Sequence, residues 1–353
     1  MRLERIEGAW TALVTPFTAT GGVHWEELER LASFQVQQGI TGLVPTGTTG
    51  ESPTLTWEEH DRVIETAIKF KGERAKVMAG TGSNSTDEAL RGSRHAVEAG
   101  ADALLLVDCY YNGPSSLELR REYHAVIARE CPEALIVPYV IPGRSGTALA
   151  PEDLAALAEE LPNVRAVKEA TGDLERMALT RQLVGDDFSI MSGDDNITPT
   201  IMADERIRAN GVVSVVSNVV PAAVEGMTRA FLAGRIQEGH RLAAALEPLF
   251  GIVTVFAENT RRVGSREVKV RDKFRNPLPI KSLMQGLGMI SNGCRRPLGR
   301  LTMPAVETVR AAARTVWNQN PELLRPIEEH FGVDIEERLT DDAFWRPLAY
   351  PDA

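Results

Sequence analysis

The stretch "KVMAGTGSNSTDEALRGSRHAVEAGADALLLVD", residues 76–108, decides the fold class. It begins with a short apolar run, residues 76–82, and ends with another, residues 101–108. Between them, Thr86–Glu98 reads as a helix, because "STDE" resembles a capping box at its start and "EAGAD" supplies a glycine at its end. A strand, a helix and a second strand in this order predict two parallel strands joined by a right-handed crossover.

The same alternation runs along the first two thirds of the chain. Further strands are predicted at residues 9–17, 42–47, 134–142, 164–170, 188–195 and 211–218. Further helices are predicted at Trp25–Gln38, Thr56–Lys71, Ser116–Glu130 and Pro151–Glu159. Eight such units within roughly 230 residues fit an α/β fold of the closed (β/α)8, or TIM-barrel, type. The alternative is an open doubly wound sheet, but no GxGxxG follows the first strand, which argues against a dinucleotide-binding fold.

The last third of the chain has a different pattern. We expect a catalytic barrel over residues 1–235 and a helical appendage over residues 236–353. The stretch "IQEGHRLAAALEPLFGIVTVFA" is predicted to continue the helices of residues 220–256. A basic insertion is expected near residues 257–275, and its basic run, residues 261–275, is predicted to be a solvated loop, with an anion-binding surface as the alternative. "PIKSLMQGLGMI" and "MPAVETVRAAARTVWNQ" are again helical in pattern.

Composition excludes several classes of protein. The 353 residues carry a net charge of −10, so we expect no nucleic-acid partner and no attraction to an anionic membrane. The N-terminal "MRLERIEGAW" lacks a signal-peptide pattern, and no apolar run reaches the roughly 20 residues of a membrane helix. No CxxC occurs among the three cysteines, Cys109, Cys131 and Cys294, so we expect neither a disulfide framework nor a zinc site. The cytoplasm is then the simplest compartment for the protein.

Chemistry in a (β/α)8 barrel takes place at the carboxyl ends of the strands, and one strand ends in a lysine. In "VRAVKEATG", residues 164–172, Lys168 follows apolar residues. Burial disfavours an ammonium and lowers its pKa, and a neutral amine can attack a carbonyl to form a Schiff base. The alternative is a lysine whose stem lies on the barrel rim while its ammonium reaches water.

The turn "GTTGE" after the second strand is a candidate anion site. Its glycines, including Gly47, let backbone N–H groups approach an anion, and the hydroxyls of Thr48 and Thr49 can hold a carboxylate or pass a proton. The alternative is an ordinary tight turn stabilised by its hydroxyl side chains.

Other polar residues also follow strands. Tyr139 lies in the fifth strand, and Tyr110–Tyr111 follow the fourth. A phenol can shuttle protons if its pKa falls. The alternative for these residues is aromatic packing. Arg144 suits bidentate carboxylate binding, with a surface arginine as the alternative. Glu169 and Asp194–Asp195 have no further carboxylates or histidines at useful spacing, so we expect solvated carboxylates or helix caps and no metal.

Five motifs occur in a fixed order: "GTTGE", "YYN-P", "Y-x-x-P-G-R-S-G", "V-K-E-A" and "SGDD". Together they resemble the dihydrodipicolinate synthase / N-acetylneuraminate lyase family of class I, Schiff-base (β/α)8 lyases. The resemblance covers roughly residues 6–235, with a weaker echo in "NPLPIKSLMQGLGM". Two features favour the synthase branch. The turn begins with Thr48, where sialic-acid lyases usually have serine, and Arg144 is present, which those lyases typically lack.

The resemblance implies a role for each motif. Lys168 would form the Schiff base with pyruvate, so no metal or organic cofactor would be required. A proton relay would consist of Tyr139, Thr48 and Tyr111, with Tyr111 coming from a neighbouring subunit. Pyruvate would be contacted by Thr49, Gly47 and the Val213 backbone. Arg144 would bind L-aspartate 4-semialdehyde.

The resemblance also implies a homodimer or homotetramer. In lysine-inhibited members of the family, lysine binds at a dimer interface. The matching positions are Ser52, Pro53, Trp57, His60, Asn84, Glu88 and Tyr110. They form a candidate allosteric lysine site, with ordinary interface packing as the alternative. The sequence departs from the family at Val140, usually asparagine, at Cys109, often proline, in the insertion at 257–275 and in the long tail beyond Leu301.

The resemblance implies a lyase that condenses pyruvate with L-aspartate 4-semialdehyde to 4-hydroxy-tetrahydrodipicolinate, a step of lysine and diaminopimelate biosynthesis. Two alternatives remain open. One is another pyruvate-dependent aldolase or dehydratase of the family, acting on a sugar acid or hydroxy-oxo acid. The other is a non-catalytic member of the family that binds a metabolite.

Overall fold

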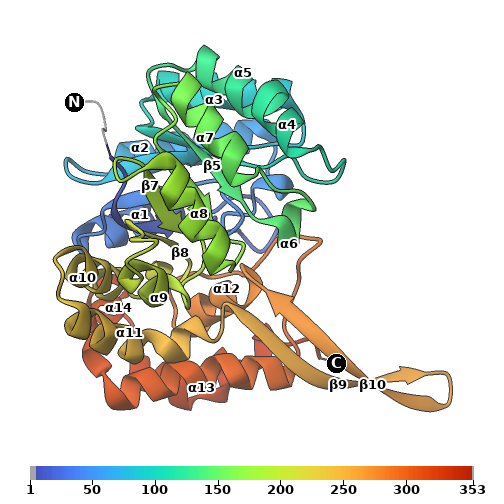
Figure 1. Ribbon diagram of the computed structural model, residues 1–353. Coiled ribbons are helices and arrows are strands. Elements are labelled where there is room, and N and C mark those ends of the chain that lie inside the picture. Colours follow the sequence, from blue (N-terminus) through green and yellow to red (C-terminus); the bar gives the residue numbers. More distant parts are fainter. Residues whose placement is uncertain (1–4, 352–353) are drawn as a thin grey trace.

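The computed structural model describes residues 5–351, and its centre is a closed barrel of eight parallel strands (Figure 1). The strands are β1 Gly8–Ala12, β2 Gly42–Val44, β3 Lys76–Gly80, β4 Ala103–Val107, β5 Leu135–Val140, β6 Ala166–Glu169, β7 Ser189–Ser192 and β8 Gly211–Ser214. Each strand pairs with the next, and β8 pairs with β1 to close the barrel. The predicted TIM barrel is therefore confirmed, and the open sheet is wrong. The strands are shorter than the apolar runs, because the ends of those runs form the loops at the barrel mouth.

Helices follow the strands and cover the barrel. The main ones are α1 Trp25–Gln37, α2 Trp57–Phe70, α3 Thr86–Ala99, α5 Ala125–Glu130, α7 Pro151–Glu160, α8 Leu174–Val184, α9 Thr198–Ala203 and α10 Pro221–Leu232. Shorter segments precede α5 and α7: α4 Ser116–Glu118 continues through a π-helical stretch, and α6 is Pro142–Ser145. The capping box before α2 is present, because Thr56 and Glu59 exchange side-chain to backbone hydrogen bonds.

Alternate residues of each strand face two different apolar layers. In β6, Ala166 packs inside the barrel whereas Val167 packs against the surrounding helices. The next residue, Lys168, therefore faces inward again. Val140 belongs to the helix-facing layer, so its side chain points away from the barrel interior. A close approach also requires Gly42, since a Cβ at this position would lie 2.2 Å from the Trp10 ring that fills the barrel.

The C-terminal helices pack onto the barrel helices as one continuous core. They are α11 Ile236–Phe250, α12 Leu278–Gly286, α13 Met303–Gln319, α14 Arg325–Phe331 and α15 Ile335–Thr340. Leu283, Val309 and Trp345 belong to the same buried cluster as Leu28 of α1. Within residues 5–351, no helix is long and apolar enough to cross a membrane.

The basic insertion is a β-hairpin that extends away from the body of the molecule (Figure 1). Its strands are β9 Thr254–Val263 and β10 Arg266–Arg275, paired antiparallel. The predicted loop and the predicted helical end of "FGIVTVFA" are therefore wrong. The physical reason is a period of two: Val255 and Ala257 are buried while Phe256 between them is exposed.

Candidate active site

Lys168 and Tyr139 are direct neighbours inside the barrel. They pair in register on β6 and β5, and Lys168 Nζ lies 4.0 Å from the centroid of the Tyr139 ring. Both side chains are buried, Lys168 at 5% exposure and Tyr139 at 4%. The alternative of a lysine extended into solvent is therefore wrong.

Burial sets the charge of this lysine. Desolvation lowers the pKa of Lys168 to about 8, against a usual 10.5, while the negative charges of Asp194 and Asp195 act in the opposite direction. Within residues 5–351, its ammonium forms no ion pair. The neutral, nucleophilic amine is therefore accessible near neutral pH.

The Tyr139 phenol is a proton donor rather than a phenolate. Burial raises its pKa to about 12, and Arg144 and a hydrogen bond with Thr48 only partly oppose that effect. The sequence analysis required a lowered pKa for a phenol that shuttles protons, and the pKa of Tyr139 is raised instead. A buried, protonated phenol beside an amine can still donate a proton to a reacting oxygen and recover it from a neighbouring hydroxyl.

The turn between β2 and α2 forms one wall of a cavity of about 230 Å³ at the barrel mouth. The cavity is lined by Thr46, Gly47, Thr48, Ser52, Pro53, Gly80, Gly82, Leu105, Val107, Tyr110, Tyr139, Ile141, Arg144 and Ser145. The structure therefore brings together Gly47, Thr48, Tyr139 and Arg144 from two separate stretches of the chain, the turn after β2 and residues 139–144. The turn packs tightly on β3, because a Cβ at Gly80 would lie 2.6 Å from the carbonyl oxygen of Thr46.

Arg144 lies in α6, at the edge of this cavity. Its Nη2 donates a hydrogen bond to the carbonyl oxygen of Asn276, at 2.8 Å. Arg275, at the base of the hairpin, donates to the carbonyl oxygen of Gly143, at 3.1 Å. The segment that follows the hairpin therefore orients the arginine predicted to bind a carboxylate.

Sequence reasoning missed Asn276. Its Nδ2 donates to Thr49 Oγ1 at 2.9 Å, and both residues are buried. Because the Thr49 hydroxyl accepts this bond, its own proton is free to donate to an anion. The Asn276 Oδ1 atom is buried and has no hydrogen-bond partner in the part of the chain that the structure describes. The only signal in the sequence was the weak family echo that begins at this residue.

Two of the acidic residues expected to be solvated carboxylates or helix caps, Asp195 and Glu169, are buried, whereas Asp194 is partly exposed. Asp195 is 3% exposed and accepts hydrogen bonds from Ser214 Oγ and from the backbone N–H groups after β8. Glu169 is 1% exposed and pairs with Arg176 at 3.2 Å. Burial also raises the pKa of Asp194. Within the part of the chain that the structure describes, no three His, Cys, Asp or Glu residues form a group that could hold a metal ion.

Four predicted residues are not among those that line the cavity of this single chain. Lys168 and Thr49 are buried next to it, against Tyr139 and Asn276. Tyr111 and Val213 are the other two. Tyr111 is 92% exposed with a φ of 80°, so its ring points away from its own barrel. Val213 is buried in β8 and packs inside the barrel, but it does not line the cavity. Their roles stay predictions.

The candidate lysine-site residues lie beside the cavity. Ser52, Pro53 and Tyr110 line it. The rings of Trp57 and His60 lie 5.1 Å apart, and burial lowers the pKa of His60 to about 4, so this imidazole is neutral.

The remaining two candidates lie on the surface. Glu88 is exposed and accepts a hydrogen bond from Ser83 Oγ at 2.7 Å, and Asn84 is also exposed. A ligand for the candidate lysine site is a prediction that this geometry leaves untested.

Comparisons with known proteins agree with the motifs. A family model described as the dihydrodipicolinate synthetase family matches residues 5–316. A 4-hydroxy-tetrahydrodipicolinate synthase from Cyanothece sp. is 40% identical over 306 residues, covering 87% of this chain and 96% of the relative. The chloride-inhibited dihydrodipicolinate synthase from Acinetobacter baumannii, complexed with pyruvate, superimposes with a TM-score of 0.79 at 33% identity, covering 88% of this chain and 99% of that one. The dihydrodipicolinate synthase from Cyanidioschyzon merolae with lysine bound superimposes with a TM-score of 0.78 at 32% identity. This match covers 88% of the present chain and 98% of that one.

Proposed function

The chain belongs to the dihydrodipicolinate synthetase family, and we propose that it joins pyruvate to L-aspartate 4-semialdehyde through a Schiff base on Lys168. The observation that carries the proposal is a buried lysine beside the buried phenol of Tyr139, with a pKa lowered to about 8 and no ion-pair partner among residues 5–351. Such an amine is the nucleophile that a class I lyase needs. The enzyme is thus a lyase of the same type as its relatives.

The chemistry follows from the neutral amine. Lys168 Nζ attacks the keto carbon of pyruvate, and loss of water leaves an iminium ion. The iminium withdraws electrons from the methyl group, so a proton leaves and an enamine forms. The enamine carbon attacks the aldehyde of the second substrate. The amine of that substrate then displaces Lys168 from the adduct, which closes the ring and regenerates the lysine.

Each substrate brings a carboxylate, and the cavity offers two anion sites. We assign the pyruvate carboxylate to the Thr48–Thr49 turn, where Gly47 and Thr48 line the cavity and Asn276 leaves the Thr49 proton free. We assign the carboxylate of aspartate semialdehyde to Arg144, whose guanidinium can form paired hydrogen bonds with it.

The proton steps require a relay. We propose that Tyr139 and Thr48 exchange protons with Tyr111 of a second copy of the chain. The exposure of the Tyr111 ring, at 92%, supports this assignment. A homodimer or homotetramer would then complete the site. The free thiols of Cys109, Cys131 and Cys294 fit the reducing cytoplasm that we propose as its compartment.

We also propose that L-lysine binds beside the cavity and inhibits the enzyme. The residues that support this are Glu88, which can pair with an amine, and Trp57, which can cover the aliphatic stem. Glu88→Ala is expected to abolish inhibition by lysine while activity without lysine stays within about twofold. Inhibition that persists in the variant would contradict this site.

Borohydride trapping tests the mechanism. Sodium borohydride added with pyruvate is expected to reduce the iminium and add the mass of a reduced pyruvate adduct at Lys168, located by peptide mass spectrometry. An unmodified Lys168 would favour the metabolite-binding alternative. Steady-state assays with aspartate semialdehyde, compared with sugar-acid and hydroxy-oxo-acid aldehydes, then separate the proposed reaction from the other pyruvate-dependent reactions.

A further inference from the structure

We infer that the buried ion pair of Glu51 and Lys281, together with Arg295, is the positioning device of the pyruvate-carboxylate turn. These residues touch no reacting atom. They hold the backbone of residues 46–51 in the conformation that places Gly47 and Thr48 in the cavity wall, next to the buried Thr49. The inference rests on the proposed function, because it concerns the carboxylate site for pyruvate.

The turn needs such support because its backbone is strained at both ends. Thr46 and Glu51 have φ values of 56° and 57°, a left-handed conformation that costs about 1 kcal/mol or more for a residue with a Cβ. Both residues are nearly fully buried. A strained conformation of this kind persists only where the surrounding structure holds it.

Lys281 of α12 supplies the first support. Its side chain is completely buried, and Nζ lies 2.5 Å from Glu51 Oε1 and 2.8 Å from the carbonyl oxygen of Thr15. Thr15 in turn donates its hydroxyl proton to the carbonyl oxygen of Gly50, at 2.7 Å. One ammonium therefore fixes both the side chain of Glu51 and, through Thr15, the backbone of the residue before it.

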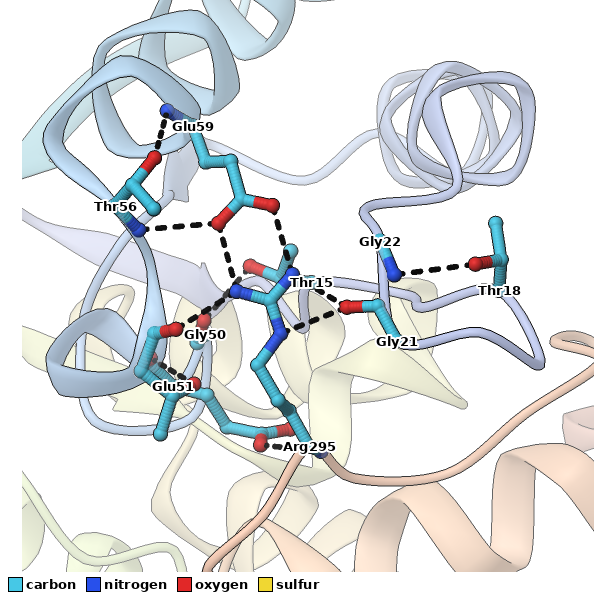
Figure 2. Close-up of polar contacts among 10 residues, drawn as sticks. Thr15, Thr18, Gly21, Gly22, Gly50, Glu51, Thr56, Glu59 and Arg295 are labelled. Carbon is cyan, nitrogen blue, oxygen red and sulfur yellow. Dashed lines mark hydrogen bonds and ion pairs between the residues drawn. The ribbon is translucent and has the colours of Figure 1, made fainter.

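Arg295, in the loop between α12 and α13, supplies the second support (Figure 2). Its backbone N–H donates to Glu51 Oε2 at 3.0 Å, so both carboxylate oxygens of Glu51 are occupied. Its guanidinium forms two bonds of 2.7 Å with Glu59 and also donates to the carbonyl oxygens of Gly21 and Thr54. One arginine thus attaches Glu51, at the C-terminal end of the turn, to the start of α2 and to the loop before α1.

A third support, from Asn276 to Thr49, comes from the start of the same segment. All three supports lie more than 200 residues after the turn in the chain. The segment 276–295 is therefore part of the catalytic unit, although the sequence suggested only a helical appendage.

Buried charge pairs give this inference a specific test. Removing one partner leaves an uncompensated buried charge and destabilises the protein, whereas replacing both partners is often nearly neutral. A purely structural pair would regain both stability and function in the double variant. A positioning pair would regain stability but not pyruvate affinity, because no neutral side chain restores the ionic contacts to the turn.

The experiment compares Glu51→Gln, Lys281→Met and the double variant E51Q/K281M. Thermal unfolding is expected to show lower Tm values for both single variants and recovery in the double variant. In the double variant, KM for pyruvate is expected to rise about tenfold, with kcat changed less than about threefold, since the lost interaction serves binding rather than the chemical step. The pyruvate concentration needed for half-maximal trapping of Lys168 should rise in parallel. Lys281→Arg should recover part of the affinity.

Lys71→Met is the matched control. Lys71 pairs with Asp102 at 3.1 Å, at the opposite, amino end of the strands, so its loss should affect Tm and leave KM for pyruvate unchanged. A wild-type KM in the well-folded double variant would overturn the positioning inference. Failure of wild-type trapping at Lys168 would instead overturn the proposed function, so the two failures are distinguishable.

Discussion

Two lysines are buried in this protein, and their surroundings are opposite. Lys168 lies in the barrel mouth at 5% exposure against the Tyr139 ring, with no ion-pair partner among residues 5–351. Lys281 lies behind the carboxylate turn at 0% exposure and bonds to a carboxylate and a backbone carbonyl. The same side chain is the proposed nucleophile at one place and an ion-paired group in contact with Glu51 at the other.

The difference teaches that burial alone does not make a lysine reactive. Desolvation disfavours the ammonium at both sites, but only Lys281 has a carboxylate in contact to compensate for the lost water. At Lys168 the nearest carboxylates oppose the shift without forming a bond, and the pKa stays lowered to about 8. The two lysines therefore differ in the groups that contact their ammonium, and not in how deeply they are buried.

The largest expected difference between the two lysines is in catalysis, and it is measured by removing each amine in turn. Lys168→Met is expected to reduce kcat by a factor of about 10³ or more, because no other amine can form the Schiff base. Lys281→Met should still be labelled by borohydride and pyruvate, at higher pyruvate concentration. Substantial turnover by the Lys168 variant in a coupled assay would contradict a covalent mechanism.

The two replacements should also change stability in opposite directions. Lys281→Met leaves Glu51 buried and unpaired, so the free energy of unfolding should fall by about 3–5 kcal/mol. Lys168→Met removes an unpaired buried ammonium and should raise the free energy of unfolding by about 1–3 kcal/mol at pH 7. Denaturant unfolding of both variants checks this, and a loss of stability in the Lys168 variant would show that its charge is compensated.

Replacing Arg144 tests the binding of the second substrate separately from the chemistry at Lys168. Arg144→Ala is expected to lower kcat/KM for aspartate semialdehyde by about 10²-fold, because the second carboxylate loses its charged partner. Trapping of pyruvate on Lys168 should be nearly unchanged. Arg206→Ala, on an exposed surface arginine paired with Glu175 and Asp204, is the control and should behave as wild type. Equal losses for both substrates would argue against the assignment.

The pH dependence tests the charge state of Lys168 directly. The rate of trapping should rise with pH through an apparent pKa of about 8. Asp194→Asn removes a negative charge that raises this pKa, so the midpoint should move to lower pH, by about 0.5 to 1 unit.

Stability should follow the same titration. Since the native pKa lies below the usual 10.5, the native state binds fewer protons than the unfolded state between these values. The contribution of Lys168 to stability should therefore rise from pH 8 to 10.5 and be absent in the Lys168→Met variant. A midpoint of trapping near 10 would contradict the desolvated amine.

The outer half of the hairpin should have the smallest effect. Val263 and Val268, near its turn, are 62% and 44% exposed, so little apolar surface is lost when residues 260–269 are replaced by a two-residue Asn-Gly turn. Activity and Tm are expected to stay near wild type. A large loss would show that this arm contributes to the active assembly, which sedimentation of the shortened variant would reveal.

The sequence alone was sufficient for the barrel and for the principal chemistry. Alternating apolar runs and capped helices are local patterns, so each strand from β1 to β8 could be placed from its own residues. Lys168, Tyr139, Thr48 and Arg144 could be singled out as candidates because strand ends meet at one face of this fold, and the roles proposed for them came from the resemblance to the family. The hairpin was missed because charged residues on its outer face obscured a period of two that is visible at Val255 and Ala257.

The surroundings of the two lysines came from the tertiary structure alone. A pKa and the energy of an ion pair depend on every neighbour that the fold brings close, and those neighbours are distant in sequence. Glu51 meets Lys281 across 230 residues, and Thr49 meets Asn276 across 227. No local pattern records such contacts, because they arise only when the segment after the hairpin packs against the mouth of the closed barrel.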